Sequence, residues 1–184
     1  MNKVLRAEAE TIINTAIQAV MPDEAVKRTL KGYQFNKGRK ILIAIGKAAW
    51  QMAKAAVDTL GSVDSGIVIT KYKHVMGTIP GVECCEAGHP IPDANSFAFT
   101  RKALGLIHNL SAEDTVIFLV SGGGSALFEL PLISGEELQK ITMDLLHSGA
   151  NIVELNKIRK RLSSVKAGLC HGLRTGQGAE YCAE

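Results

Sequence analysis

The sequence predicts an α/β fold in which a parallel sheet carries helices on both faces, and two observations support this prediction. Short runs of branched aliphatic residues, of which residues 115–120 (TVIFLV) are the most apolar, suit strands that are buried on both faces. Longer amphipathic stretches that are rich in good helix formers separate these runs. Strands that alternate with helices in this way form parallel sheets covered by helices.

Each element follows from a local pattern and its boundaries. Pro22 ends the first helix, Gly61 caps the third, and Asn95 or Ser96 caps the fourth. The expected strands cover residues 39–46, 66–70, 81–87 and 115–120. The expected helices cover residues 2–21, 25–30, 47–61, 95–110, 134–148 and 151–164.

The composition is that of an ordinary globular protein, with 46% hydrophobic and 21% charged residues. The net charge of +3 is too small to indicate a nucleic-acid partner. No apolar run approaches the roughly 20 residues that a membrane span needs. Glu8 and Glu10 interrupt the N-terminal apolar pattern, which excludes a secretion signal. We therefore expect a cytoplasmic protein with reduced cysteines and no nucleic-acid or membrane partner.

The turn after the first long strand is one candidate site. Ligands of parallel α/β sheets bind beyond the carboxyl ends of the strands, where Gly46 and Lys47 lie in this sequence. A helix N-terminus already favours anions, so a lysine there suggests a phosphate or carboxylate held by both the helix amides and the ammonium. Gly46 would clear room for that ligand. The alternative is a solvated lysine.

A glycine-rich loop follows the most apolar strand and forms a second candidate site, made of Ser121, Gly122, Gly123, Gly124 and Ser125. Three consecutive glycines cost backbone entropy, so a ligand is expected to approach this backbone closely. Consecutive N–H groups can hold an anion, and the two hydroxyls add donors. The loop matches neither G-x-x-x-x-G-K-[ST] nor G-x-G-x-x-G. The alternative is a flexible turn.

Two further stretches carry candidate residues. The two prolines of residues 86–96 (EAGHPIPDANS) stiffen a loop, so His89 and Asp93 could face a ligand there. For His89 a positional role is favoured over catalysis, and Asp93 also fits a plain helix entry. Asn156 and Arg159 share one face of the last helix and suit phosphate and hydroxyl recognition, although a solvated basic face fits equally.

Taken together, four stretches resemble the glycerate 2-kinase family, whose members carry a MOFRL domain at their C-terminal end and were long named hydroxypyruvate reductases. The stretches are IAIGKAAWQMA, EAGHPIPDANS, LVSGGGSAL and GANIVELNKIRKRLSSVKAG, in this order. The resemblance covers residues 6–166. It implies an incomplete, Rossmann-like N-terminal domain of a two-domain family.

The resemblance also implies an activity, the ATP-dependent phosphorylation of D-glycerate to 2-phosphoglycerate, with ATP and Mg²⁺ bound in a cleft between the two domains. Lys47 matches the active-site lysine of the family, residues 121–125 match its glycine-rich loop, and Asn156 and Arg159 match its asparagine–arginine helix. Phosphoryl transfer needs mainly cations and amide donors around moving negative charge, which agrees with these residue types. Which anion each of them binds stays open.

The end of the chain departs from the family pattern. Residues 159–161 read Arg-Lys-Arg where the family has Arg-Lys-His, and the glycine-rich residues 167–184 have no periodicity. The metal-holding aspartates and the MOFRL domain of the family are absent from the sequence. We therefore expect residues 1–166 to form a partial N-terminal domain, residues 167–184 to be an irregular tail, and the chain to have little or no kinase activity alone.

Two other functions stay open. A hydroxypyruvate reductase that uses NAD(P)H would need a dinucleotide fingerprint and an acid after the second strand, where the sequence has residues 70–72 (TKY). A non-catalytic remnant would bind an anion or a partner chain. Its exposed apolar surface would favour a homodimer.

Overall fold

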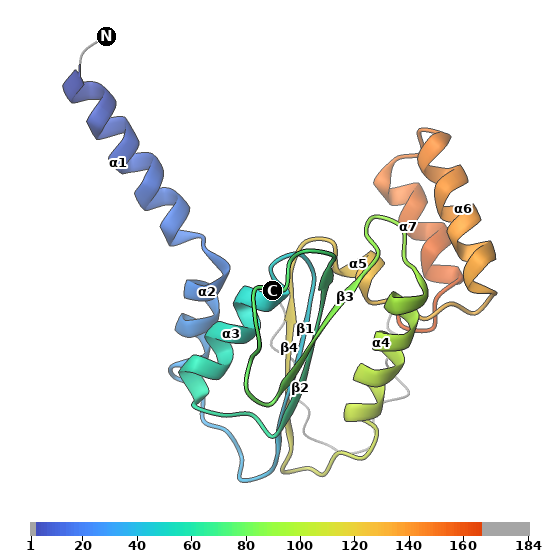
Figure 1. Cartoon of the computed structure of the whole chain (residues 1–184), viewed down its shortest axis with the longest axis horizontal. Coiled ribbons are helices and arrows are strands. Elements are labelled where there is room, and N and C mark those ends of the chain that lie inside the picture. The colour runs from blue at the N-terminus through green and yellow to red at the C-terminus, as the bar shows by residue number, and fades with distance from the viewer. Residues whose placement is uncertain (1–2, 167–184) are drawn as a thin grey trace.

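The computed structural model of the chain describes residues 3–166 and has the predicted α/β architecture (Figure 1). The tail predicted at residues 167–184 lies outside the described residues. The strands are β1 (Lys40–Ile45), β2 (Ser65–Lys71), β3 (Val82–Ala87) and β4 (Thr115–Val120). The helices are α1 (Lys3–Ala19), α2 (Pro22–Leu30), α3 (Ala49–Leu60), α4 (Ala94–Leu106), α5 (Gly124–Leu127), α6 (Gly135–His147) and α7 (Ile152–Arg161).

The four strands form one sheet in the order β3-β2-β1-β4, and every neighbouring pair is parallel. β1 therefore lies between β2 and β4, and Ile45 at its end is level with Val120 at the end of β4. Since parallel strands point the same way, the loops after β1, β2, β3 and β4 all leave the same edge of the sheet. The candidate loops of the sequence meet at this edge.

The two faces of β1 explain why its residues are almost uniformly apolar. Leu42 and Ala44 pack with α2 and α3 on one face, whereas Ile43 and Ile45 pack with α4 and α5 on the other. Successive strand residues point to opposite faces, so a strand covered on both sides needs apolar residues at every position. In Figure 1, α3 and α4 lie on opposite sides of the sheet.

The helix ends agree with the predicted caps in one case and differ in another. Gly61 ends α3 with a φ of 77°, and its N–H donates to the carbonyl of Val57, as predicted. The prediction that Asn95 or Ser96 caps α4 is wrong, because Asp93 is the N-cap. The Asp93 carboxylate accepts the N–H of Ser96, and the Ser96 hydroxyl accepts the N–H of Asp93.

Two helices differ from the prediction: α5 was not predicted, and α1 was predicted but not its exposed position. α5 is a single turn that begins inside the glycine loop at Gly124. α1 has the predicted periodicity but buries no residue, and it projects away from the sheet in Figure 1. Within residues 3–166, no helix is both long and apolar enough to cross a membrane.

Candidate anion-binding site

The turn after β1 lies directly against the loop after β4. The N–H of Lys47 donates to the carbonyl of Gly122 at 2.9 Å, and the N–H of Ser121 donates to the carbonyl of Ile45, also at 2.9 Å. These bonds continue the β1–β4 ladder one step beyond the sheet. The backbone of the two loops is therefore held in one register.

Gly46 allows the turn after β1 to pack directly against Ser121, and the role of Gly46 in making room for a ligand stays a prediction. Gly46 has a φ of 111°, and a Cβ there would lie 2.2 Å from Ser121 Oγ. The Ser121 hydroxyl accepts the N–H of Ala48 at 3.0 Å and donates to the carbonyl of Ile45 at 3.2 Å. This hydroxyl is therefore occupied within the protein, where the sequence suggested a donor to an anion.

Gly123 is the point where three loops approach one another. It has a φ of 89°, and a Cβ there would lie 2.8 Å from His89 Nε2 and 3.4 Å from Lys47 Cε. Within residues 3–166, neither the N–H of Gly122 nor that of Gly123 donates to a protein group. Free amides beside a lysine stem are donors suited to an anion.

The hydrogen bonds of Lys47 with residues 3–166 involve its backbone, so its ammonium is available to a ligand. Its side chain is exposed and makes no ion pair with any described acid of residues 3–166. Its carbonyl accepts from Thr70 Oγ1 at 3.5 Å and contacts His74 Nδ1 at 3.1 Å. α3 begins only at Ala49, so Lys47 lies in the turn before the helix that the sequence predicted it to start.

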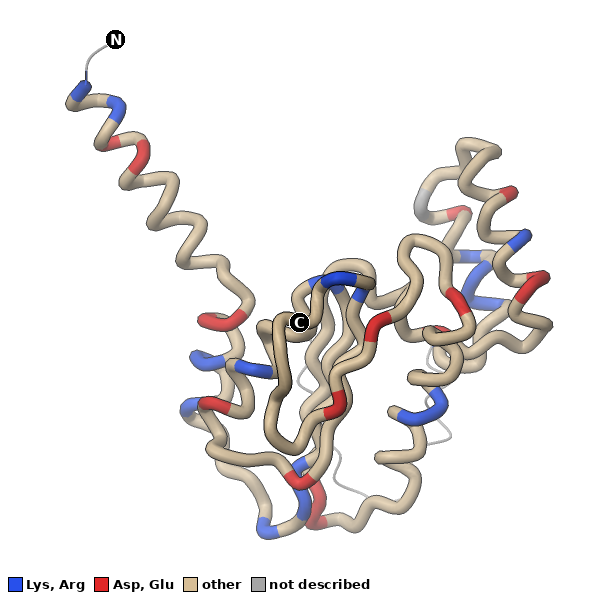
Figure 2. The backbone as a smooth tube through the Cα atoms, viewed as in Figure 1, with Lys and Arg blue, Asp and Glu red and all other residues tan. Residues whose placement is uncertain are grey.

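His89 lies half-buried in the loop after β3. Burial lowers the pKa of its imidazole below the ordinary 6.5, and the nearby charges of Lys47, Lys71 and Arg159 lower it further. The ring is therefore neutral at pH 7. Three cations around one neutral ring mark an electropositive region, and Figure 2 shows basic residues at the upper end of the sheet and on the helices to its right.

Arg159 connects α7 to the glycine loop. Its Nη2 donates to the carbonyl of Ser125 at 3.0 Å and lies 3.8 Å from Glu129 Oε2. The Lys166 ammonium binds the same carboxylate oxygen, and the Glu129 side chain is fully buried. Asn156 is half-buried on α7, one turn before Arg159. The structure thus places Arg159 beside the loop at Ser125.

The remaining predicted residues serve the scaffold in the contacts described. Gly124 packs against β1, since a Cβ there would meet Ile45 Cδ1 at 3.2 Å. Asp93 accepts the Tyr72 hydroxyl at 2.6 Å in addition to capping α4. Burial alone raises the pKa of Asp93, but these hydrogen bonds lower it by more, so it stays ionised.

Sequence reasoning missed the buried Glu129 and its partner Lys166. Glu129 stands in the apolar run 126–133 (ALFELPLI), and an acid within such a run is the one signal that indicated a buried carboxylate. Its backbone N–H donates to Thr100 Oγ1 at 3.0 Å, and its Oε1 accepts the N–H of Leu130 at 3.1 Å. These contacts fix the carboxylate that holds the two cations.

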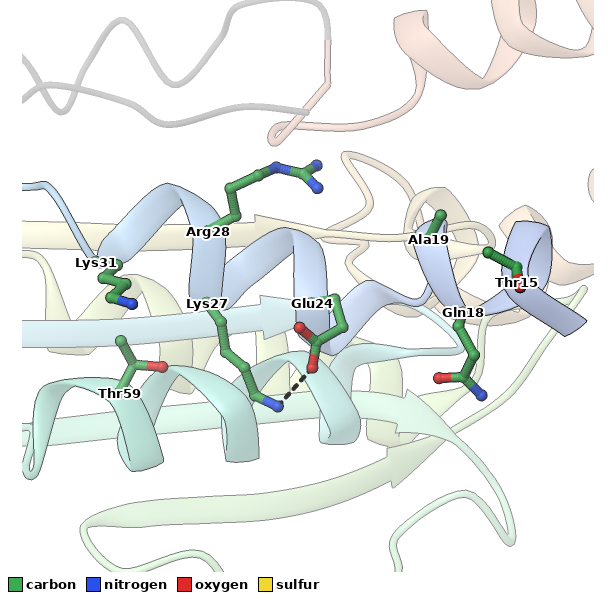
Figure 3. Close-up of a pocket in the computed structure, with 8 residues that line it drawn as sticks. All are labelled: Thr15, Gln18, Ala19, Glu24, Lys27, Arg28, Lys31 and Thr59. Carbon is green, nitrogen blue, oxygen red and sulfur yellow. Dashed lines mark hydrogen bonds and ion pairs between the residues drawn. The ribbon is translucent and has the colours of Figure 1, made fainter.

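One open groove lies away from these loops. An open groove of about 1010 Å³ runs between α1, α2 and α3, and Figure 3 shows its lining, in which Lys27 pairs with Glu24. None of the candidate residues lines this groove. The groove lies where α1 projects away from the sheet (Figure 1). Because the candidate residues meet at the loops and not in this groove, we place the candidate site at the loops.

The described residues do not supply a metal site. Across residues 3–166, no group of three His, Cys, Asp or Glu side chains could hold a metal ion. Glu86, near the end of β3, already accepts the N–H groups of His74 and Val75 at 2.9 Å each. The described residues therefore contain no preformed cluster of acids for Mg²⁺.

The fold and the loops define an α/β protein with an electropositive cluster at the carboxyl edge of a parallel sheet. The chain belongs to the family described as "Domain of unknown function (DUF4147)", whose pattern matches residues 8–174.

Known proteins confirm the resemblance inferred from the motifs. A relative from Thermotoga maritima, named D-glycerate 2-kinase, is 53% identical over 167 residues, which are 89% of this chain and 40% of that protein. A relative from Agrobacterium vitis, provisionally named a hydroxypyruvate reductase, is 36% identical over 85% of this chain and 36% of that protein. The crystal structure of the T. maritima glycerate kinase superposes with a TM-score of 0.88 at 48% identity and covers 99% of this chain. The chain spans only 45% of that structure.

Proposed function

We propose that Lys47, the glycine loop 121–125 and Arg159 form the anion-binding half of a glycerate 2-kinase site, which binds the carboxylate of D-glycerate or a phosphate of ATP. The observation that carries this proposal is the approach of Lys47 Cε and His89 Nε2 to the same glycine, Gly123, beside amides that have no protein partner among residues 3–166. The names of the relatives support the choice of substrates.

The chemistry of phosphoryl transfer fits these groups. The transferred phosphoryl group carries its charge on oxygens that need donors already in place, and the protein contributes little covalent chemistry. The Lys47 ammonium is a point charge on a flexible stem, and the amides of Gly122 and Gly123 are fixed dipoles beside that stem. Asn156 on α7 is our proposed additional ligand for a hydroxyl or phosphate oxygen. The use of ATP and Mg²⁺, the cytoplasmic location and the homodimer stay predictions from the sequence.

Calorimetric titration of the full chain with 2-phosphoglycerate tests the proposal. We expect Lys47→Met to weaken binding by about 10-fold or more, because hydrogen bonds to charged groups contribute roughly 1.5–3 kcal/mol. The matched control is Lys140→Met, since Lys140 is exposed on α6. The difference between the two variants should shrink as salt is added. Equal affinity of both variants would rule out Lys47 as an anion ligand.

A reductase is the weaker alternative. Dinucleotide sites of this fold place an acid at the end of the second strand for the ribose hydroxyls, but β2 ends in Thr70 and Lys71. Thr70 is fully buried, and its hydroxyl faces the carbonyl of Lys47. We therefore expect no quenching of NADH fluorescence when the full chain is added. Saturable quenching in the micromolar range would favour the reductase.

A further inference from the structure

The imidazole of His89 lies against the glycine loop at Gly123. Its Nε2 would lie 2.8 Å, and its Cδ2 2.9 Å, from a Cβ placed on Gly123. The imidazole edge therefore lies directly over the glycine. Only a glycine fits here, since any side chain at position 123 would displace either the imidazole or the Lys47 stem.

Three charged groups from three different parts of the fold act on this ring. Lys47 is contributed by the turn after β1, Lys71 by the end of β2 and Arg159 by α7. All three are cations and disfavour protonation of the imidazole, and partial burial acts in the same direction. In the absence of ligand the ring is thus a neutral acceptor amid donors.

A neutral imidazole carries one proton, on Nδ1 or on Nε2, and the nitrogen without the proton accepts hydrogen bonds. A backbone hydrogen bond of His89 itself raises the pKa of the ring, against the effects of burial and of the three cations. An acceptor at Nε2 over Gly123 requires this proton to be on Nδ1.

We propose that His89 Nε2 accepts a hydrogen bond from the substrate hydroxyl adjacent to the bound anionic group, and so determines that the site takes a 2-hydroxy acid. This role rests on the function proposed above. Lys47, Arg159 and the amides around Gly123 can only donate to a ligand, so they recognise its oxyanions. A hydroxyl hydrogen needs an acceptor, and Nε2 is the acceptor placed among them.

The acceptor also explains why a site for anions contains a histidine that is not charged. A protonated imidazole would add one more donor to several cations and would leave the hydroxyl hydrogen without a partner. A site built to bond a hydroxyl rejects the analogue that lacks it, because its own polar group then stays unpaired. We therefore expect selection for the hydroxyl rather than for charge alone.

The first test reads the imidazoles of the full ¹⁵N-labelled chain by NMR between pH 5 and 8. We expect His89 to be protonated on Nδ1 alone above its ordinary pKa of 6.5, with a titration midpoint below that value. His108, which is exposed after the end of α4, provides the internal reference. A proton on Nε2 at pH 7.5, or a midpoint at or above 6.5, would overturn the acceptor role.

The second test compares D-glycerate with 3-hydroxypropionate, which lacks the 2-hydroxyl, by calorimetry at pH 7.5. The wild-type chain should favour D-glycerate by about 5- to 10-fold, the size of one neutral hydrogen bond. His89→Phe should abolish this preference, His89→Gln should restore part of it through its amide oxygen, and His108→Phe should leave it unchanged. Equal binding of the two acids by the wild-type chain contradicts the acceptor role alone. No binding of either acid contradicts the proposed function, and the acceptor role falls with it.

Discussion

Gly46 packs directly against Ser121. A Cβ on Gly46 would lie 2.2 Å from Ser121 Oγ and 2.4 Å from the Ser121 carbonyl oxygen. The residues are 75 positions apart, yet they close the gap between the loop that carries Lys47 and the loop that carries the free amides. The relative position of the two candidate loops therefore depends on the glycine at position 46.

Gly46→Ala should destabilise the chain by about 3 kcal/mol or more, since it combines a clash with backbone and a φ of 111° that L residues rarely adopt. Urea unfolding of the full chain followed by circular dichroism measures the change. The matched control is Gly122→Ala, because a Cβ on Gly122 meets nothing within 4 Å. A control as unstable as Gly46→Ala would contradict the packing argument.

Ser121→Ala removes the hydroxyl that joins the turn after β1 to β4. The Ala48 N–H would lose its acceptor, so we expect a loss of about 1–2 kcal/mol in the same unfolding experiment. Ser125→Ala is the comparison, since Ser125 contributes its carbonyl to Arg159 and its side chain is exposed. That variant should change stability by less than about 0.5 kcal/mol. Equal effects would mean that the Ser121 hydroxyl is dispensable.

The strands were predictable because their pattern is local. β1 is a run of branched aliphatics between a basic residue and Gly46, and the predicted residues 39–46 overlap its observed bounds, Lys40–Ile45. Double-sided burial leaves this signature in the sequence itself. The meeting of Lys47 with residues 121–125 needed one further fact, the pairing of β1 with β4, and strand order is a long-range property that no local pattern contains.

Other features could not be predicted for the same reason. Periodicity predicted the α1 helix but not that its apolar face buries nothing, because periodicity says that a face is apolar and not what covers it. The role of Glu129 depends on Arg159 and Lys166, which lie 30 and 37 positions further along the chain. The packing of Gly46 against Ser121, 75 positions further along the chain, likewise depends on the fold and not on a local pattern.

Glu129→Gln should be the most damaging polar substitution of this group. The Glu129 side chain is 0% exposed, and those of its partners Arg159 and Lys166 are only 11% and 12% exposed. Burial lowers the pKa of Lys166, while the carboxylate raises it, so removing the carboxylate leaves two largely desolvated cations without their counter-ion. Removing one member of a buried ion pair costs about 3–5 kcal/mol. The measurement is the free energy of unfolding in urea.

Glu136→Gln is the matched control for Glu129→Gln, because Glu136 is exposed in the first turn of α6. It should change the free energy of unfolding by less than about 0.5 kcal/mol. A Glu129→Gln variant as stable as this control would show that the pairing contributes nothing to the fold. The hydrogen bond from Arg159 to Ser125 would then have to be explained without the carboxylate.

Asp114 should make stability depend on acid pH. Its side chain is 5% exposed, and the Arg39 guanidinium, together with the N–H groups of Ser111 and Arg39, holds the pKa of this carboxyl well below the ordinary 3.8. A carboxyl with a lowered pKa in the folded state stabilises the fold above its unfolded pKa, and this contribution disappears as the pH falls below that value.

Wild-type stability should therefore decline from about pH 4 downward, and Asp114→Asn should be less stable at pH 7 but lose less over this range. Asp58→Asn, which removes an exposed carboxyl paired with Lys54, should keep the wild-type slope. Thermal unfolding midpoints measured from pH 2.5 to 7 decide the matter, and parallel curves for Asp114→Asn and the wild type would assign the acid sensitivity to another carboxyl.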